Sequence, residues 1–320
     1  MRRRDDGRVG PVTEPEAAVS WQCRVVQTLV RTVVRPRLTL AGGVMPLRRN
    51  ISYLCPLLSR IPDGVAIAAV TYDGVSAEWT RCSRPAATPT FIHFHGGGFV
   101  AGSPLLSRSI VSGLVRRFGS QGFSVDYRLA PEHPHPAATD DAWTFYRALC
   151  AEGTDPSSVV ILGESAGAAL ALDLCLKIGA ASQTPPRALV LISPWLDLSL
   201  SGDTVRDQPE IDPGLPIEFM MAARRLYRPH GALDDPAASP LFAALRDLPP
   251  VLIQVGGLEV LRDDARRLAR RLEQAGVPHR LEEWAGMHHV WHLAPFGVPE
   301  ARRAIAAIAA FVEQPKAAAA

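Results

Sequence analysis

One stretch constrains the fold more than any other, an apolar run that meets an Ala- and Leu-rich run at a single serine. Val159–Leu162 is typical of a buried strand, and residues 166–178 have the composition of a helix. Between them, Gly163 and Gly167 stand two residues to either side of Ser165. A side chain at either glycine would crowd so tight a crossing from strand to helix. The stretch therefore predicts a nucleophile elbow, a strained turn that presents a serine hydroxyl above the sheet.

Length and composition narrow the remaining possibilities. A chain of 320 residues with 47% hydrophobic content can bury a large core, and one α/β domain with an insertion or cap fits it better than two equal domains. The net charge is only +2, and no basic stripe is interleaved with aromatic residues, so a nucleic acid partner is not expected. The five cysteines show no C-x-x-C spacing, which favours a reducing compartment over a disulfide framework or a zinc site.

The N-terminal region contains no recognisable targeting segment. Met1–Arg4 is basic, but acidic residues follow it instead of an apolar run, and no apolar stretch reaches the roughly 18 residues of a membrane span. We therefore expect a soluble, cytoplasmic protein without stable membrane insertion, and disorder over residues 1–15. From Val19 to Leu40 apolar residues recur with helical spacing among arginines. This amphipathic helix fits either a membrane surface or a lid over the core, and we favour the lid.

The remaining pattern predicts an α/β fold. Strands are expected at residues 66–72, 75–81, 90–95, 123–126, 159–162, 188–192, 251–255 and 279–284. Helices are expected at residues 107–118, 137–152, 166–178, 260–274 and 299–313, with residues 46–62 as a connection. Because strands and helices alternate after an opening hairpin at Asp73-Gly74, the eight-stranded sheet should be mostly parallel and covered by helices on both faces.

The chain divides into two expected parts. Residues 199–236 break the alternation of strands and helices with a Pro-, Asp- and Gly-containing insertion around a short helix at 217–227. We predict that this insertion and residues 1–52 form a helical cap, over a catalytic core of residues 53–198 and 237–320.

A second glycine-rich stretch could stabilise the negative charge that develops in acyl transfer. His95-Gly96-Gly97-Gly98-Phe99 follows the third expected strand, and its glycines leave backbone N–H groups uncovered. On its own this is a plain Gly-rich turn, but its combination with the elbow favours an oxyanion hole. The N–H group of Ala166, next to the serine, would be a further donor.

A base and an acid should follow the serine in chain order. His288 and His289 lie in the loop just past the last strand, which is where the catalytic base is expected. His230 and His279 fit surface or strand positions. For the acid, Glu259, Asp263 and Asp264 follow the strand at 251–255. Glu259 is preferred because it is nearest the strand end, while carboxylates in a helix's first turn often serve the helix dipole alone.

Together these motifs resemble those of the bacterial hormone-sensitive-lipase-like (family IV) esterases of the α/β-hydrolase superfamily. The resemblance covers the core and rests on His95–Phe99, Asp126–Pro134, Gly163–Gly167, Ser193–Trp195 with Asp197, Leu258–Asp264 and Gly286–Trp291. It implies a capped carboxylesterase for short- to medium-chain esters that uses no metal or cofactor, and it allows a homodimer. By position it assigns Ser165 as nucleophile, His289 as base, and Gly97, Gly98 and Ala166 as oxyanion donors.

The sequence departs from the family pattern at three places. Glu259 stands where the family usually has Asp, Ala168 replaces a usual Gly, and the segment 118–126 is shortened. We also expect Asp126, Arg128 and Glu132 to form a buried polar brace near the elbow.

Other functions fit the same fold and motifs. A deacetylase or lactonase of a natural product would use the same three catalytic groups. A non-catalytic small-molecule receptor is less favoured, because such a protein typically lacks one of them.

Overall fold

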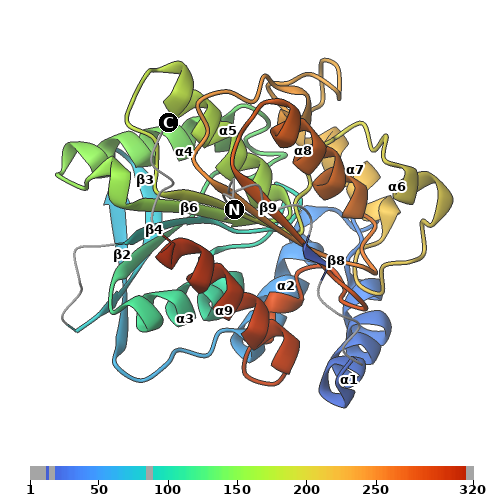
Figure 1. Ribbon diagram of the computed structural model, residues 1–320. Helices are drawn as coiled ribbons and strands as arrows, with labels where there is room; N and C mark the ends of the chain where they lie inside the picture. The colour runs from blue at the N-terminus through green and yellow to red at the C-terminus, as the bar shows by residue number, and fades with distance from the viewer. Residues whose placement is uncertain (1–11, 14–18, 84–88, 315–320) are drawn as a thin grey trace, which may run out of the picture.

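The computed structural model describes residues 12–13, 19–83 and 89–314, and these form one twisted sheet covered by helices (Figure 1). The eight expected strands are present as β2 (Val65–Tyr72), β3 (Val75–Cys82), β4 (Thr90–Phe94), β5 (Gln121–Val125), β6 (Val159–Glu164), β7 (Ala188–Ile192), β8 (Val251–Gly256) and β9 (His279–Trp284). Their order is β9-β8-β7-β6-β4-β5-β3-β2.

A ninth strand was not expected. The two-residue strand β1 (Val12–Thr13) pairs in parallel with β9 at the sheet edge. The prediction of disorder over residues 1–15 is therefore wrong for Val12 and Thr13, whose backbone joins the sheet. The rest of that range lies outside the described residues.

The sheet is mostly parallel, as predicted. Only the pairs β2–β3 and β3–β5 run antiparallel among the described strands, and β2 and β3 meet at a tight hairpin. At its tip Asp73 and Gly74 both have positive φ angles, of 45° and 82°, as a two-residue hairpin turn requires. Strands β4, β6, β7 and β8 are buried along their whole length, which explains their continuous apolar sequence.

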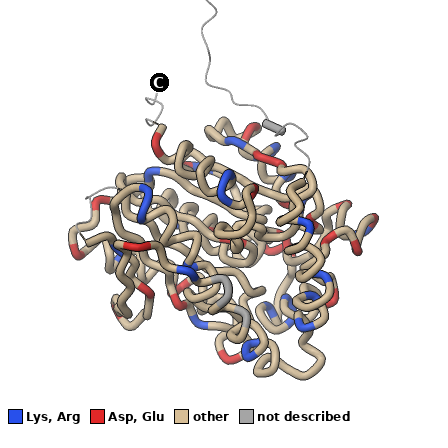
Figure 2. The backbone as a smooth tube through the Cα atoms, turned by 90° about the horizontal axis from the view of Figure 1, so that it is seen from below, with Lys and Arg blue, Asp and Glu red and all other residues tan. Residues whose placement is uncertain are grey.

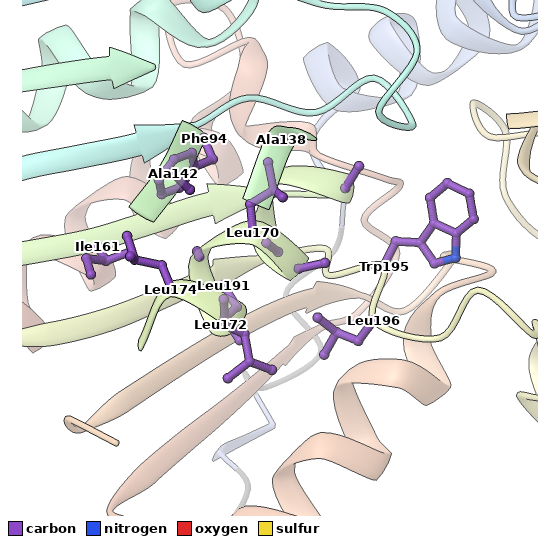
Figure 3. Packing of buried hydrophobic residues seen from close by; sticks show 14 of the residues in the cluster. Phe94, Ala138, Ala142, Ile161, Leu170, Leu172, Leu174, Leu191, Trp195 and Leu196 are labelled. Carbon is purple, nitrogen blue, oxygen red and sulfur yellow. The ribbon is translucent and has the colours of Figure 1, made fainter. Parts of the chain in front are cut away.

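Helices cover both faces of the sheet (Figure 1). On one face lie α3 (Arg108–Phe118) and α9 (Pro299–Glu313), and on the other α4 (Ala137–Ala151), α5 (Ala166–Ala180) and α8 (Arg262–Gln274). Helix α5 follows the elbow and is buried along most of its length. Figure 3 shows its leucines packed between the sheet and α4, with Leu170, Leu172 and Leu174 beside Phe94, Ile161 and Leu191. This packing fixes the serine at the helix's first turn.

The shortened segment 118–126 still forms a complete strand. Helix α3 ends at Gly119, whose φ of 61° and ψ of 32° are left-handed, and only Gly119 and Ser120 separate the helix from β5. The N–H group of Ser120 closes the turn on the carbonyl of Val115. All five residues of β5 then pair with β4 on one side and with β3 on the other, so the sheet keeps its register.

Residues 21–58 are helical except for a turn at residues 38–43, and this corrects one prediction. The expected helix at 19–40 is present as α1 (Trp21–Leu29), a π-helical turn (Val30–Val34) and a 3₁₀ turn (Arg35–Arg37). Residues 46–62 are not a mere connection, because most of them belong to α2 (Val44–Leu58). Its prolines were misleading: Pro46 lies in the first turn, where no helical N–H bond is lost, and Pro56 lies near the end.

The insertion lies beside this N-terminal region. It contains α6 (Asp203–Asp207) and α7 (Ile217–Tyr227), and in Figure 1 α1, α6 and α7 lie at the right of the view. The Arg35 guanidinium joins the two parts through the Glu210 carboxylate and the carbonyl of Asp212. Among the described helices, none is both long and apolar enough to span a lipid bilayer.

Candidate active site

Ser165 stands at a strained turn between β6 and α5. Its φ of 54° and ψ of −122° are unfavourable for a residue with a side chain. The two flanking glycines make the turn sterically feasible. A Cβ on Gly163 would lie 2.3 Å from the Gly167 carbonyl oxygen, and one on Gly167 would lie 2.1 Å from that of Phe94. Neither position can therefore hold another residue without moving the backbone, as the sequence predicted.

A chain of hydrogen bonds runs from Ser165 to a buried carboxylate. His289 Nε2 lies 3.0 Å from Ser165 Oγ, and His289 Nδ1 lies 2.9 Å from a carboxylate oxygen of Glu259. The other Glu259 oxygen accepts hydrogen bonds of 2.6 Å from the Gly256 N–H and from the Ser193 hydroxyl. Glu259 follows β8 and His289 follows β9, so the ends of neighbouring parallel strands bring these groups together with the elbow.

The surroundings of His289 favour its protonated form. Burial alone would lower the pKa of the imidazole, but the hydrogen bond that its Nδ1–H donates to Glu259 and the charges of Glu259 and Asp212 raise that pKa above its ordinary value. A base whose cationic form is stabilised in this way accepts a proton from a nearby hydroxyl more readily.

Asp212 is a second buried carboxylate at this point, and it is not among the residues that the motifs predict. Atoms of Asp212, Glu259 and His289 lie within 4.8 Å of one another. One Asp212 oxygen accepts from the N–H groups of Gly214 and Leu215, and the other has no partner among the described residues. Burial raises the pKa of Asp212 to about 6. Nothing in its local sequence, Asp-Pro-Gly, distinguishes it from an ordinary turn residue.

The other candidate acids have different partners. Asp263 accepts from the backbone N–H and the hydroxyl of Thr204, at the start of α6. Asp264 accepts from the N–H groups of Leu196 and Asp197, and burial raises its pKa to about 7. Both lie in the first turn of α8, and neither has a hydrogen bond or ion pair to His289.

The remaining candidate histidines are not placed to act as the base. His288 is buried, and desolvation lowers its pKa to about 4. His279 lies within β9 and bonds the Val277 carbonyl, while His230 is exposed beyond the end of α7. Among the described histidines, His289 is the one that contacts both Ser165 and Glu259.

The glycine-rich loop after β4 lies directly against the elbow. Gly97 and Gly98 have φ angles of 120° and 64°, and their missing side chains matter. A Cβ on Gly97 would lie 2.1 Å from the Ala101 carbonyl oxygen, and one on Gly98 would lie 2.9 Å from the Phe219 ring of α7. Within the described part of the chain, the backbone N–H groups of Gly97, Gly98 and Ala166 donate no hydrogen bond. Three unused donors thus border the serine.

Glu164, the residue before the serine, holds this loop in place. Its carboxylate accepts from the Gly96 N–H at 2.8 Å, from His93 Nε2 at 2.5 Å and from the Ser107 hydroxyl. Burial opposes ionisation, but these partners hold the pKa of Glu164 below its ordinary value. His95 shapes the loop from the other side: its Nδ1 donates to the Gly96 carbonyl, and desolvation lowers its pKa to about 4.

The predicted brace of Asp126, Arg128 and Glu132 is wrong. All three residues are exposed, and no hydrogen bond or ion pair joins them to one another within the described residues. Arg128 pairs with Asp141 at the start of α4, and Glu132 pairs with Arg48 of α2. Glu164 forms the buried brace of the elbow instead. Its partners His93, Gly96 and Ser107 come from a strand, a loop and a 3₁₀ turn, and no common sequence pattern links them.

A cavity of about 490 Å³ opens in front of the serine. The N-terminal helices form one wall, the glycine-rich loop and the insertion form another, and the segment after β9 closes the third. Its lining is mainly apolar and comprises Val26, Leu29, Val30, Val33, Val34, Arg37, Leu38, Asn50, Ile51, Gly96, Gly97, Gly98, Leu106, Glu164, Ser165, Gly214, Leu215, Phe219, His288, His289, Val290, Trp291, Leu293 and Ala294. The two cap candidates, far apart in sequence, thus enclose one pocket.

Known proteins share this architecture over most of its length. A family model described as an α/β-hydrolase fold matches residues 91–293. An esterase of Acinetobacter venetianus is 36% identical, over 91% of this chain and 96% of its own length, and an acetyl-hydrolase of Streptomyces hygroscopicus is 40% identical, over 76% and 81%. The crystal structure of an esterase from the bacterial hormone-sensitive-lipase family superposes with a TM-score of 0.86 at 35% identity, covering 92% of this chain and 98% of that one.

Sequence, fold and relatives therefore agree on the expected family. This chain belongs to the bacterial hormone-sensitive-lipase family of esterases, within the α/β-hydrolase fold.

Proposed function

We propose that this carboxylesterase hydrolyses short- to medium-chain carboxylic esters through an acyl-enzyme, with Ser165, His289 and Glu259 as its catalytic triad. The observation that carries the proposal is the continuous chain of hydrogen bonds from the Ser165 hydroxyl through His289 to the buried Glu259 carboxylate. Such a chain activates a serine hydroxyl that is otherwise a weak nucleophile.

In the first half-reaction, Ser165 Oγ attacks the ester carbonyl while its proton passes to His289 Nε2. Glu259 stabilises the imidazolium through the Nδ1–H bond and keeps the ring in the required orientation. The carbonyl oxygen becomes negative and accepts hydrogen bonds from the N–H groups of Gly97, Gly98 and Ala166. The proton on His289 then moves to the leaving alcohol as its bond to the acyl carbon breaks.

In the second half-reaction, a water molecule replaces the alcohol. His289 takes a proton from this water, whose oxygen attacks the acyl carbon, and the second tetrahedral intermediate uses the same three N–H donors. Its collapse releases the carboxylic acid and returns the proton to Ser165. The scheme requires no metal or cofactor.

The pocket supports the proposed preference for shorter acyl chains. We assign residues 1–52 and 199–236 to the cap and residues 53–198 and 237–320 to the catalytic core, because α1 and α7 both contribute to the cavity wall. A cavity of about 490 Å³ with a mainly apolar lining beside Ser165 accommodates a small ester.

The proposal is tested by turnover of p-nitrophenyl acetate and butyrate, with labelling of the serine by a fluorophosphonate probe. We expect hydrolysis of both esters and labelling that is lost in Ser165→Ala. A folded wild-type protein that binds these esters without hydrolysing them, and does not react with the probe, would be a receptor, and the proposal would fail.

A second candidate is an acetyl-ester hydrolase acting on a natural product. It is favoured by the acetyl-hydrolase of Streptomyces hygroscopicus, which is 40% identical to this chain. The same triad would serve it, as it would serve a lactonase. Steady-state rates on acetylated alcohols of increasing size, with a lactone panel alongside, distinguish these possibilities from a general esterase.

A further inference from the structure

The helical segment of residues 19–62 has an unusual charge distribution. It contains no Asp or Glu, whereas it carries seven arginines, although the whole chain has a net charge of only +2. Two of them pair with acids from elsewhere, Arg35 with Glu210 and Arg48 with Glu132. The other five are exposed: Arg24, Arg31, Arg37, Arg49 and Arg60. Figure 2 shows the distribution of basic and acidic positions along the backbone.

Most of the large apolar side chains that are exposed, among the described residues, lie in this same segment. Within the described residues nine such side chains are exposed, and seven of them fall between residues 21 and 61. Trp21, Val25 and Leu29 follow one another at four-residue intervals along α1, and Trp21 is 71% exposed. Tyr53 of α2 is 73% exposed. Single exposed apolar residues need no explanation, but such a concentration does.

Packing on the core does not account for this stripe. The opposite side of α1 already meets the protein, where Cys23 is buried near Met287 and Trp284, and Val26 packs on the same cluster. Val26, Leu29, Val30 and Val33 also line the cavity, so the exposure of Leu29 and Val33 is exposure toward that pocket. Trp21 and Val25 belong to neither the buried cluster nor the cavity lining, so they form an apolar face of α1 that points outward beside exposed arginines.

From this combination we propose that the outer face of residues 19–62 docks the enzyme on an anionic phospholipid surface. Tryptophan and aliphatic side chains insert at the headgroup level, and exposed arginines pair with lipid phosphates. A second copy of this chain would fit the apolar stripe but would bring two acid-free, arginine-rich segments together. Charge complementarity therefore selects the anionic surface.

Docking in this orientation would place the cavity wall at the lipid interface. Helix α1 supplies Val26 and Leu29 to the cavity and Trp21 and Val25 to the outward apolar face, so an ester in the contacted leaflet would have a short path to Ser165. This consequence rests on the proposed function, whereas the docking itself does not.

Vesicle co-sedimentation tests the docking separately from catalysis. We use the full chain carrying Ser165→Ala, with vesicles of phosphatidylcholine alone or mixed with equal phosphatidylglycerol. We expect binding to the anionic vesicles in 50 mM salt, at least about tenfold weaker binding to the neutral vesicles, and release in 500 mM salt because screening shortens the range of the attraction.

Paired variants separate the two contributions. Trp21→Ser with Val25→Ser, and separately Arg24→Gln with Arg31→Gln, should each weaken binding to the anionic vesicles by about tenfold or more. Met221→Ser and the pair Arg270→Gln with Arg302→Gln are matched controls, because they remove an exposed apolar residue and two exposed arginines elsewhere. These controls should bind like the parent, and circular dichroism establishes that every variant is folded.

The proposal is overturned if the parent protein ignores anionic vesicles at low salt, or if the controls lose binding as much as the segment variants. It is also overturned if sedimentation shows a dimer that Trp21→Ser with Val25→Ser dissociates while no vesicle binding occurs. In that case the face is a contact between two copies.

Discussion

At the scale of single residues, the carboxylate opposite His289 is the least expected feature. A glutamate has one more methylene than the aspartate usual in this family, and the structure accommodates it by holding one carboxylate oxygen with the Gly256 N–H and the Ser193 hydroxyl. The other oxygen is left to face His289. The Gly256 N–H and the Ser193 hydroxyl thus position the longer side chain, and the hydrogen bond between Glu259 and His289 is kept at 2.9 Å.

Two matched substitutions test this assignment. Glu259→Gln should reduce kcat by about 10³- to 10⁴-fold, because an amide neither stabilises the imidazolium nor enforces the tautomer. Asp263→Asn should cost less than about tenfold, because Asp263 contacts Thr204 and the amide keeps an oxygen for that bond. Steady-state kinetics on p-nitrophenyl butyrate measure both, and the reverse ranking would move the acid to Asp263.

The buried Asp212 should affect the pH dependence of catalysis. His289 must be neutral to accept a proton, so kcat/KM should rise as pH rises through its elevated pKa. With a pKa of about 6, Asp212 is largely ionised over that range and favours the imidazolium. Asp212→Asn removes this charge and keeps an acceptor for Gly214 and Leu215. The acid limb of the kcat/KM profile should therefore move to lower pH. If the acid limb of the kcat/KM profile does not move, the charge of Asp212 does not affect the pKa of His289.

At the scale of elements, the short connection from α3 to β5 depends on one backbone conformation. Gly119 is left-handed at φ 61°, and a Cβ there would meet no neighbour within 4 Å, so any cost of substitution comes from the backbone alone. A Cβ on Gly113, in the middle of the same helix, would also meet no neighbour within 4 Å, but Gly113 has an ordinary helical conformation. The two glycines form a natural pair of probe and control.

We expect Gly119→Ala to lower the free energy of unfolding by about 1 kcal/mol, because an L-residue is strained in the left-handed region. Gly113→Ala should raise it by about 0.5–1 kcal/mol, because alanine restricts the unfolded chain and favours the helix. Urea denaturation followed by circular dichroism compares the two. Equal effects would mean that the turn at Gly119 is not the constraint on β5.

At the scale of the whole molecule, the enclosed cavity should limit the acyl chain. Its volume of about 490 Å³ lies between the cap segments and the core. On p-nitrophenyl esters from acetate to palmitate, we expect kcat/KM to be highest at or below about six to eight carbons, because longer chains must leave the enclosed space. A maximum at palmitate in detergent-free solution would mean that the cap opens fully during turnover.

The elbow and the hairpin could be predicted from the sequence because each depends on interactions between residues that are close along the chain. The steric demand of the elbow explains why Gly163, Ser165 and Gly167 could be recognised from spacing alone, and the two-residue hairpin at Asp73-Gly74 requires positive φ angles. The family predicted from these motifs is confirmed by the comparisons. Helix α2 was missed because Pro46 and Pro56 normally indicate a break, although both lie near helix ends, where few backbone bonds are lost.

The sequence by itself determined the order of strands and helices, the serine turn, the glycine-rich loop and the short set of acids and histidines beyond them, since these depend on neighbours along the chain. Only the tertiary structure decided which of these groups meet. The contact of His289 with Glu259 rather than Asp263, the contacts of Glu164 and the presence of Asp212 beside His289 depend on segments that lie 30 to 77 residues apart. Contacts between such distant segments arise from packing, which leaves no periodic signal in any one of them.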